Sequence, residues 1–174
     1  MSRALAAALV LASGGALARD AAPVTPTRTE AAAYAITHSL LVVNLVKNCD
    51  RFGAQLGRDP AAALAGWRQR NGGRVAAAEA YFVFARAASE RLGGAAAGED
   101  FHARTHGLSV QQANRTLNDI FGALGPRPAV CKRWIEAIAQ GQTDLDWQSK
   151  YLPLLDELVE FERKIRSGAL PDAR

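Results

Sequence analysis

The sequence predicts an all-α protein, a helical bundle of four main helices plus a short one, stapled by one disulfide. Apolar residues recur every three or four positions along nearly the whole chain, and no segment alternates every two residues as a half-buried strand would. Brief connections rich in glycine and proline separate these segments, which favours antiparallel neighbours in a bundle. Two cysteines, Cys49 and Cys131, lie on the apolar stripes of two different helices.

Residues 1–18 have the pattern of a secretory signal peptide. Arg3 provides a positive start, a short apolar run follows, and the tripeptide at 16–18 has the small residues that signal peptidase requires. The run is too short to span a bilayer, and no cysteine follows it for lipid attachment. We therefore expect cleavage near Ala18 and a periplasmic or secreted protein with no transmembrane or lipid anchor, since no later stretch has the apolar length of a membrane span.

The mature chain begins with a mobile leader, residues 19–26, and continues as one domain over residues 27–170. Thr27 and Glu30 have the spacing of a capping box and predict a first helix from there to about Gly57. Its apolar stripe consists of Tyr34, His38, Leu41, Leu45, Cys49, Phe52 and Leu56.

Asp59 followed by Pro60 predicts the start of a second helix, because aspartate is a favoured N-cap and proline is tolerated at the first helical position. Its stripe contains Leu64, Trp67, Asn71, Val75, Ala78, Phe82 and Ala85. Gly72 and Gly73 interrupt good helix formers, which predicts a kink or a close approach by another backbone.

The remaining helices follow from start and stop signals. Ser109, with a glutamine three residues on, predicts the cap of a third helix, so the preceding stretch EDFHARTHG, 99–107, is interpreted as a polar connection. The sequence GPRP at 125–128 ends that helix. A short fourth helix carries Cys131, and a last helical region follows the TDLD motif at 143–146, whose carboxylates fit helix-start roles.

Cysteine count and charge restrict the class of protein. In an oxidising compartment, two cysteines predict a single disulfide between Cys49 and Cys131, and the closed loop stabilises the fold by about 4 to 5 kcal/mol in the chain-entropy view. Lysine and arginine number 21 against 17 acidic residues, a modest excess that is typical of a solvated surface. We expect no nucleic acid among the partners.

Two of the three histidines, His102 and His106, are four residues apart, the spacing at which a helix can present two imidazoles to one metal ion. Glu99 and His38 are the candidates for a third ligand of zinc or copper. The zinc-hydrolase signature needs a glutamate directly after the first histidine, but Ala103 stands there. His38, on an apolar stripe, is also interpreted as a core histidine with a hydrogen-bonded neighbour.

A second group of polar residues lies on the second helix. Trp67 and Asn71 share its apolar stripe, which indicates either a ligand pocket or a buried polar contact that sets helix register, with Asn44, His38 or the Gly72 carbonyl as partner. Arg70 and Arg74, also four apart, could bind a phosphate or carboxylate, or could remain solvated.

The chain has no nucleophile elbow, no phosphate-binding glycine loop and no C-x-x-C motif. We therefore expect an exported, non-enzymatic protein without a cofactor that acts through contacts with an envelope or secreted protein. One alternative is a periplasmic metal- or small-ligand-binding protein that uses His102 and His106. A further alternative is a hydrolase with an unrecognised site.

Overall fold

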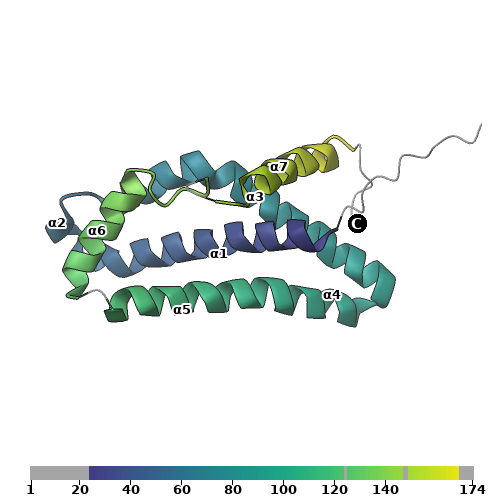
Figure 1. Cartoon of the computed structure of the whole chain (residues 1–174), viewed down its shortest axis with the longest axis horizontal. Coiled ribbons are helices and arrows are strands. Elements are labelled where there is room, and N and C mark those ends of the chain that lie inside the picture. Colours follow the sequence, from purple (N-terminus) through teal and green to yellow (C-terminus); the bar gives the residue numbers. More distant parts are fainter. Residues whose placement is uncertain (1–23, 124, 147–148, 169–174) are drawn as a thin grey trace, which may run out of the picture.

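A computed structural model describes residues 24–123, 125–146 and 149–168, and none of these residues is in a β-strand. The predicted signal peptide lies outside them. The all-α bundle with one disulfide is confirmed (Figure 1). The helices are α1 (Pro26–Cys49), α2 (Gly53–Leu56), α3 (Pro60–Gly93), α4 (Ala95–His102), α5 (Leu108–Ala123), α6 (Arg127–Ala139) and α7 (Leu152–Arg166).

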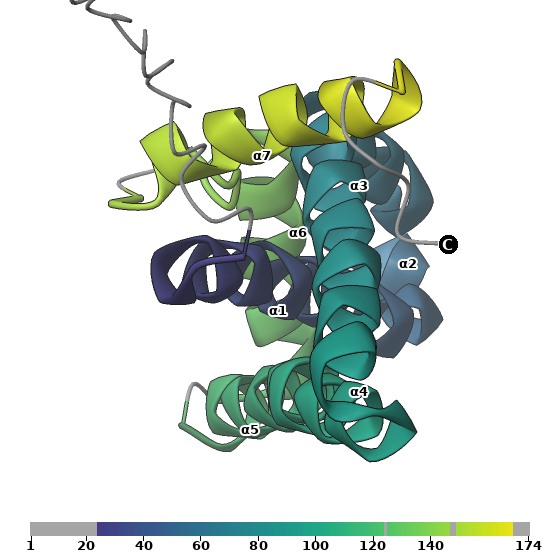
Figure 2. The ribbon, with the colours of Figure 1, turned by 90° about the vertical axis from the view of Figure 1, so that its right-hand side faces the viewer.

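Helix α1 runs through the middle of the bundle, between α5 on one side and α3 and α7 on the other (Figures 1 and 2). No Asp, Glu, Lys or Arg occurs in residues 31–46, and buried side chains such as Ile36 and Val42 point to different faces. A helix that is apolar on several faces has to be covered on several faces, and α3, α5, α6 and α7 all contact α1.

The segment Pro26–Leu56 is long and apolar enough, by length and composition alone, to cross a membrane. The expectation that no stretch after the leader meets this criterion is therefore wrong. In this structure the segment packs as the central helix of the bundle.

The disulfide connects the end of α1 to α6. Cys49 and Cys131 are both fully buried, and their Cα atoms are 5.3 Å apart. After Cys49 the chain makes a turn of 3₁₀ helix at 50–52 and the short α2, which ends at Gly57 in the left-handed region with φ 69°. The first predicted helix thus has the expected extent, but it is not one continuous α-helix.

The two predicted helix starts differ in outcome. The Asp59–Pro60 start is confirmed, since the Asp59 carboxylate accepts a hydrogen bond from the backbone N–H of Ala61 at 2.9 Å. The Thr27–Glu30 capping box is wrong. Thr25 is the N-cap and accepts from the backbone N–H of Arg28 at 3.2 Å, because Pro26 occupies the first helical position that proline prefers.

Residues 99–107 are helical, not a connection. Helix α4 continues into a π-helical segment at Ala103–Gly107 and then into α5 without a break. Ser109 is buried and its hydroxyl donates to the Thr105 carbonyl at 3.0 Å, one turn back, so it caps nothing. The alanines at the start of α4 are strong helix formers, and the wider π turn accommodates the residues that follow. The helix therefore continues through the polar stretch.

Helix α3 passes through Gly72 and Gly73 without interruption. A Cβ atom added at either glycine would meet nothing within 4 Å, so the predicted close approach of another backbone is wrong.

We predict that Gly72→Ala and Gly73→Ala each raise the free energy of unfolding by about 0.5 to 1 kcal/mol, because alanine loses less backbone entropy in a helix and the space is free. Gly98→Ala is the matched control. There a Cβ would lie 3.1 Å from the Cβ of Glu90, so no gain is expected. Chemical denaturation measures all three, and a gain for Gly98→Ala equal to the others would contradict the explanation.

Candidate functional site

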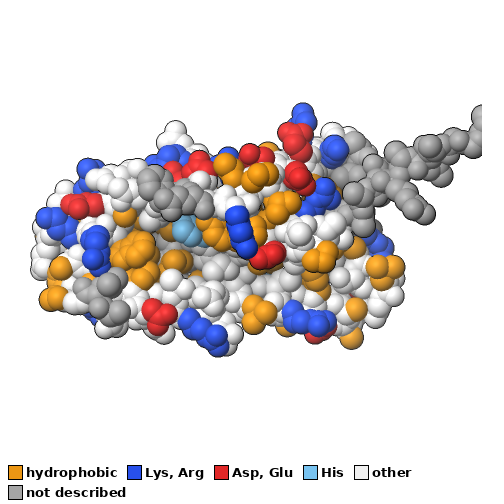
Figure 3. Space-filling model, in the orientation of Figure 1, with side chains coloured by type: hydrophobic (Ala, Val, Ile, Leu, Met, Phe, Trp, Pro, Cys, Tyr) orange, Lys and Arg blue, Asp and Glu red, His pale blue; other side chains and the backbone are white. Residues whose placement is uncertain are grey.

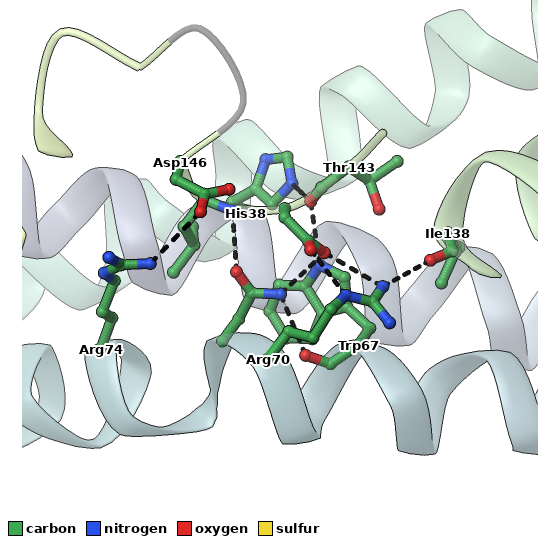
Figure 4. A network of polar contacts seen from close by, with 10 residues as sticks. His38, Trp67, Arg70, Arg74, Ile138, Thr143 and Asp146 are labelled. Carbon is green, nitrogen blue, oxygen red and sulfur yellow. Dashed lines mark hydrogen bonds and ion pairs between the residues drawn. The ribbon is translucent and has the colours of Figure 1, made fainter. Parts of the chain in front are cut away.

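The most connected group of polar side chains holds the turn 140–146, between α6 and α7, against α1 and α3 (Figure 4). Trp67, Arg70 and Arg74 recur at three and four residues along α3 and therefore lie on one side of that helix. His38 reaches the same turn from α1. The acidic residues of TDLD do not cap α7, which begins at Leu152, but bind the arginines of α3.

The carbonyl oxygen of Thr143 accepts two hydrogen bonds. Trp67 donates from its indole nitrogen at 2.9 Å, and His38 from Nε2 at 2.6 Å. A carbonyl oxygen can only accept, so the proton of a neutral His38 ring is on Nε2. Trp67 is 1% exposed and its one polar atom is used in this contact, so it does not form the floor of an open ligand pocket.

Asn71, also 1% exposed, acts as a buried connector. Its side-chain oxygen accepts from the backbone N–H of Leu145 at 2.8 Å, and its amide nitrogen donates to the Trp67 carbonyl at 3.0 Å and to the Asp144 carboxylate at 2.9 Å. The expected partners, Asn44, His38 and the Gly72 carbonyl, are therefore not the ones it uses.

The two arginines bind carboxylates of the same chain. Arg70 makes a bidentate pair with Asp144, at 2.6 and 3.2 Å, and donates to the Ile138 carbonyl at 2.8 Å. Arg74 donates to Asp156 of α7 at 3.1 Å and lies 3.7 Å from Asp146. The predicted carboxylate chemistry is thus present, but it is used to hold the turn and α7 rather than an external anion.

Burial lowers the pKa of His38 below its ordinary value, and the hydrogen bond to Thr143 and the charge of Asp144 oppose that effect only in part. The folded protein therefore favours the neutral imidazole, which the contact with the carbonyl also uses.

The four candidate metal ligands do not come together. His38 is occupied by Thr143, and Glu99 forms an ion pair with Arg86. His102 and His106 do lie together, with ring centroids 5.1 Å apart and planes 13° from parallel. Within the described part of the chain, no group of three His, Cys, Asp or Glu side chains could hold a metal ion.

The chain matches no protein-family model, no curated protein and no solved structure. What the site can do chemically is therefore inferred from the geometry of its own residues. Apart from the Thr143 hydroxyl, which is buried without a partner, the polar groups around the turn satisfy one another, and this is the arrangement of a structural clamp. Sequence reasoning identified the clamp residues on α1 and α3 but missed their partners Thr143, Asp144 and Leu145, for which the TDLD motif and the buried position of Asn71 were the available signals.

We predict that Asn71→Leu destabilises the protein by at least about 1 to 3 kcal/mol, because the buried N–H of Leu145 loses its acceptor. Arg74→Gln, on the same side of α3 but in exposed ion pairs, is expected to cost about 1 kcal/mol or less. Urea denaturation compares them. Equal losses for the two variants would show that Asn71 is not the connector of the turn.

We predict that the wild type loses stability as pH falls below 6.5, the ordinary pKa of histidine, towards the lowered pKa of folded His38. Above that window His38 is neutral in both folded and unfolded chains and contributes no pH dependence. Within the window, the unfolded chain takes up a proton at His38 more readily than the folded chain, so unfolding becomes easier as the pH falls.

His38→Gln keeps a side-chain N–H donor and removes the titration, so its stability should change less over the same window. The other two histidines are present in both proteins, so their contributions to the pH dependence of stability cancel in the comparison. Thermal melts between pH 7.5 and 4.5 measure the difference, and parallel curves for the two proteins would contradict the assignment.

Proposed function

We propose that the protein is a small exported helical-bundle protein, not an enzyme, that acts through protein–protein contacts in the cell envelope. The observation that carries this proposal is the outer face of α5. We define the α5 face by its exposed residues, which are Leu108, Val110, Gln111, Gln112, Asn114, Arg115, Asn118, Asp119 and Gly122.

The α5 face is poor in charge for a solvent-exposed helix. Leu108 and Val110 are 57% and 36% exposed, and the charged residues of α5 are one arginine and one aspartate. Helix α7, of similar length, carries Asp156, Glu157, Glu160, Glu162, Arg163, Lys164 and Arg166. Figure 3 shows the contrast, with charged side chains gathered over α7 and sparse over α5. Depletion of charge is the compositional mark of the centre of an interface.

An apolar hollow adjoins the α5 face. It lies between the start of α1 and residues 104–108 and has a volume of about 520 Å³. Its apolar lining residues are Val24, Pro26, Ala33 and Leu108, and its polar ones are Thr25, Thr29, Glu30, Arg104 and Thr105. Leu108 belongs both to the hollow and to the α5 face. The partner we propose is a helix of another envelope protein, with uncharged polar side chains over the amides of α5 and an aliphatic side chain in the hollow.

Export is supported by two independent features. The N-terminal residues have the composition of a signal peptide, and the buried Cys49–Cys131 disulfide is typical of proteins that mature in an oxidising compartment. Both favour a protein that meets its partner outside the cytoplasm.

The experiment is position-specific photo-crosslinking in the cells that make the protein. A photoreactive residue replaces Gln112 on the α5 face or, as the matched control, Glu160 on the charged surface of α7. We expect one discrete adduct from position 112 and none from position 160. Leu108→Asp should abolish the adduct while the disulfide and the melting temperature are retained, and the recovered protein should begin at Arg19.

Equal adducts from both positions, or an adduct that survives Leu108→Asp, would overturn the interface. An adduct of twice the protein's own mass would identify a second copy and overturn the proposed partner. Retention of the initiator methionine in the mature protein would overturn export.

A further inference from the structure

We propose that His102 and His106 form a two-histidine site for a divalent transition metal ion, with copper(II) the ion bound most tightly. This site is separate from the α5 face, and the proposal does not depend on the proposed partner. It rests on the geometry of the pair, on the lack of hydrogen bonds and ion pairs to the two rings in the described part of the chain, and on the surface beside them.

The helical backbone brings the two imidazoles together. His102 ends α4 and His106 lies in the π-helical segment, so the two side chains leave the same side of one continuous helix. Their rings are stacked, with centroids 5.1 Å apart and planes 13° from parallel. His102 is exposed and His106 half-buried, and exposed side chains change rotamer within nanoseconds, so a rotation of the His102 ring can turn one of its nitrogens towards an ion shared with His106.

The ring nitrogens have no protein partner in the described part of the chain, where neither imidazole makes a hydrogen bond or an ion pair. The two neighbouring carboxylates are already used, because Asp100 pairs with Arg104 and Glu99 pairs with Arg86. The pair is therefore not explained as half of a salt bridge. This distinguishes it from His38, whose Nε2 is held by the Thr143 carbonyl.

Neutral imidazole is a ligand for copper, zinc and nickel, and two histidines four apart on a helix are a known way of presenting two such ligands to one ion. With two protein ligands and water in the other positions, affinity follows the general order of divalent metals, in which copper(II) exceeds zinc. A site with open positions binds metal reversibly and leaves room for a further ligand.

The surface beside the pair fits such a ligand. Both histidines line a hollow of about 270 Å³ whose apolar part contains Ile36, Phe82 and Phe101 and whose charged part contains Glu79 and Arg86. Val83, which is 68% exposed, borders it too. An apolar wall next to a metal position limits the access of water and strengthens the bond between metal and ligand. The π turn itself is a rare helical form that recurs at functional sites.

The test uses the mature protein with its disulfide intact and without an affinity tag, titrated with copper(II) and followed by calorimetry and electron paramagnetic resonance. We expect one copper per chain with hyperfine coupling to nitrogen. His102→Ala and His106→Ala should each weaken binding on the order of tenfold or more, because the second imidazole no longer acts at high effective concentration. Zinc should bind more weakly than copper.

The matched control keeps the number of histidines and changes their spacing. In the double variant His106→Ala with Ala103→His, the imidazoles are adjacent in sequence and do not face each other, while Arg104 still pairs with Asp100, so copper binding should fall as in His106→Ala. His38→Gln should bind as the wild type does. Tight binding by the respaced variant, or copper binding that His102→Ala leaves unchanged, would overturn the site and identify adventitious binding only.

Discussion

The bundle depends on the burial of α1. A helix with no charged side chain over sixteen consecutive residues, 31–46, is apolar on several sides and has to be covered on several sides, and four other helices contact it. The disulfide at its last residue fixes α6 beside it, with both cysteines fully buried. The position of α6 then determines where the following turn, residues 140–146, begins. The clamp is thus a consequence of how the central helix is covered.

The clamp shows how polar groups can be buried at low cost. One carbonyl, that of Thr143, takes donors from α1 and α3, and the amide of Asn71 serves both a backbone N–H and a carboxylate. Such a network adds little net stability per bond, but removal of one member leaves its partner buried and unpaired. The polar residues of the clamp therefore serve the fold, whereas the partner surface and the metal site proposed above lie on α4, the π segment and α5.

The sequence allowed the fold to be predicted where the signal is local. The Asp59–Pro60 start, the apolar periods and the placement of both cysteines on apolar stripes depend on neighbouring residues, and the structure agrees with them. The choice of Thr25 over Thr27 and the passage of the helix through Ser109 depend on small differences between competing caps and turns. Two partners of Asn71, Asp144 and Leu145, lie more than 70 residues away in a turn without any period, so the TDLD motif marks the turn as polar but no local pattern pairs it with Asn71.

The disulfide divides the molecule into a covalently closed ring and two parts outside it, α1 up to Cys49 and α7. It joins residues 82 apart, so the chain from the end of α1 through α5 into α6 is a closed ring even when unfolded. Helix α7 lies outside that ring and is held to α1 and α3 by packing and by exposed ion pairs such as Arg28–Glu157 and Arg74–Asp156. The ring and the last helix can therefore open as separate cooperative units, with α7 the first to exchange its amide hydrogens.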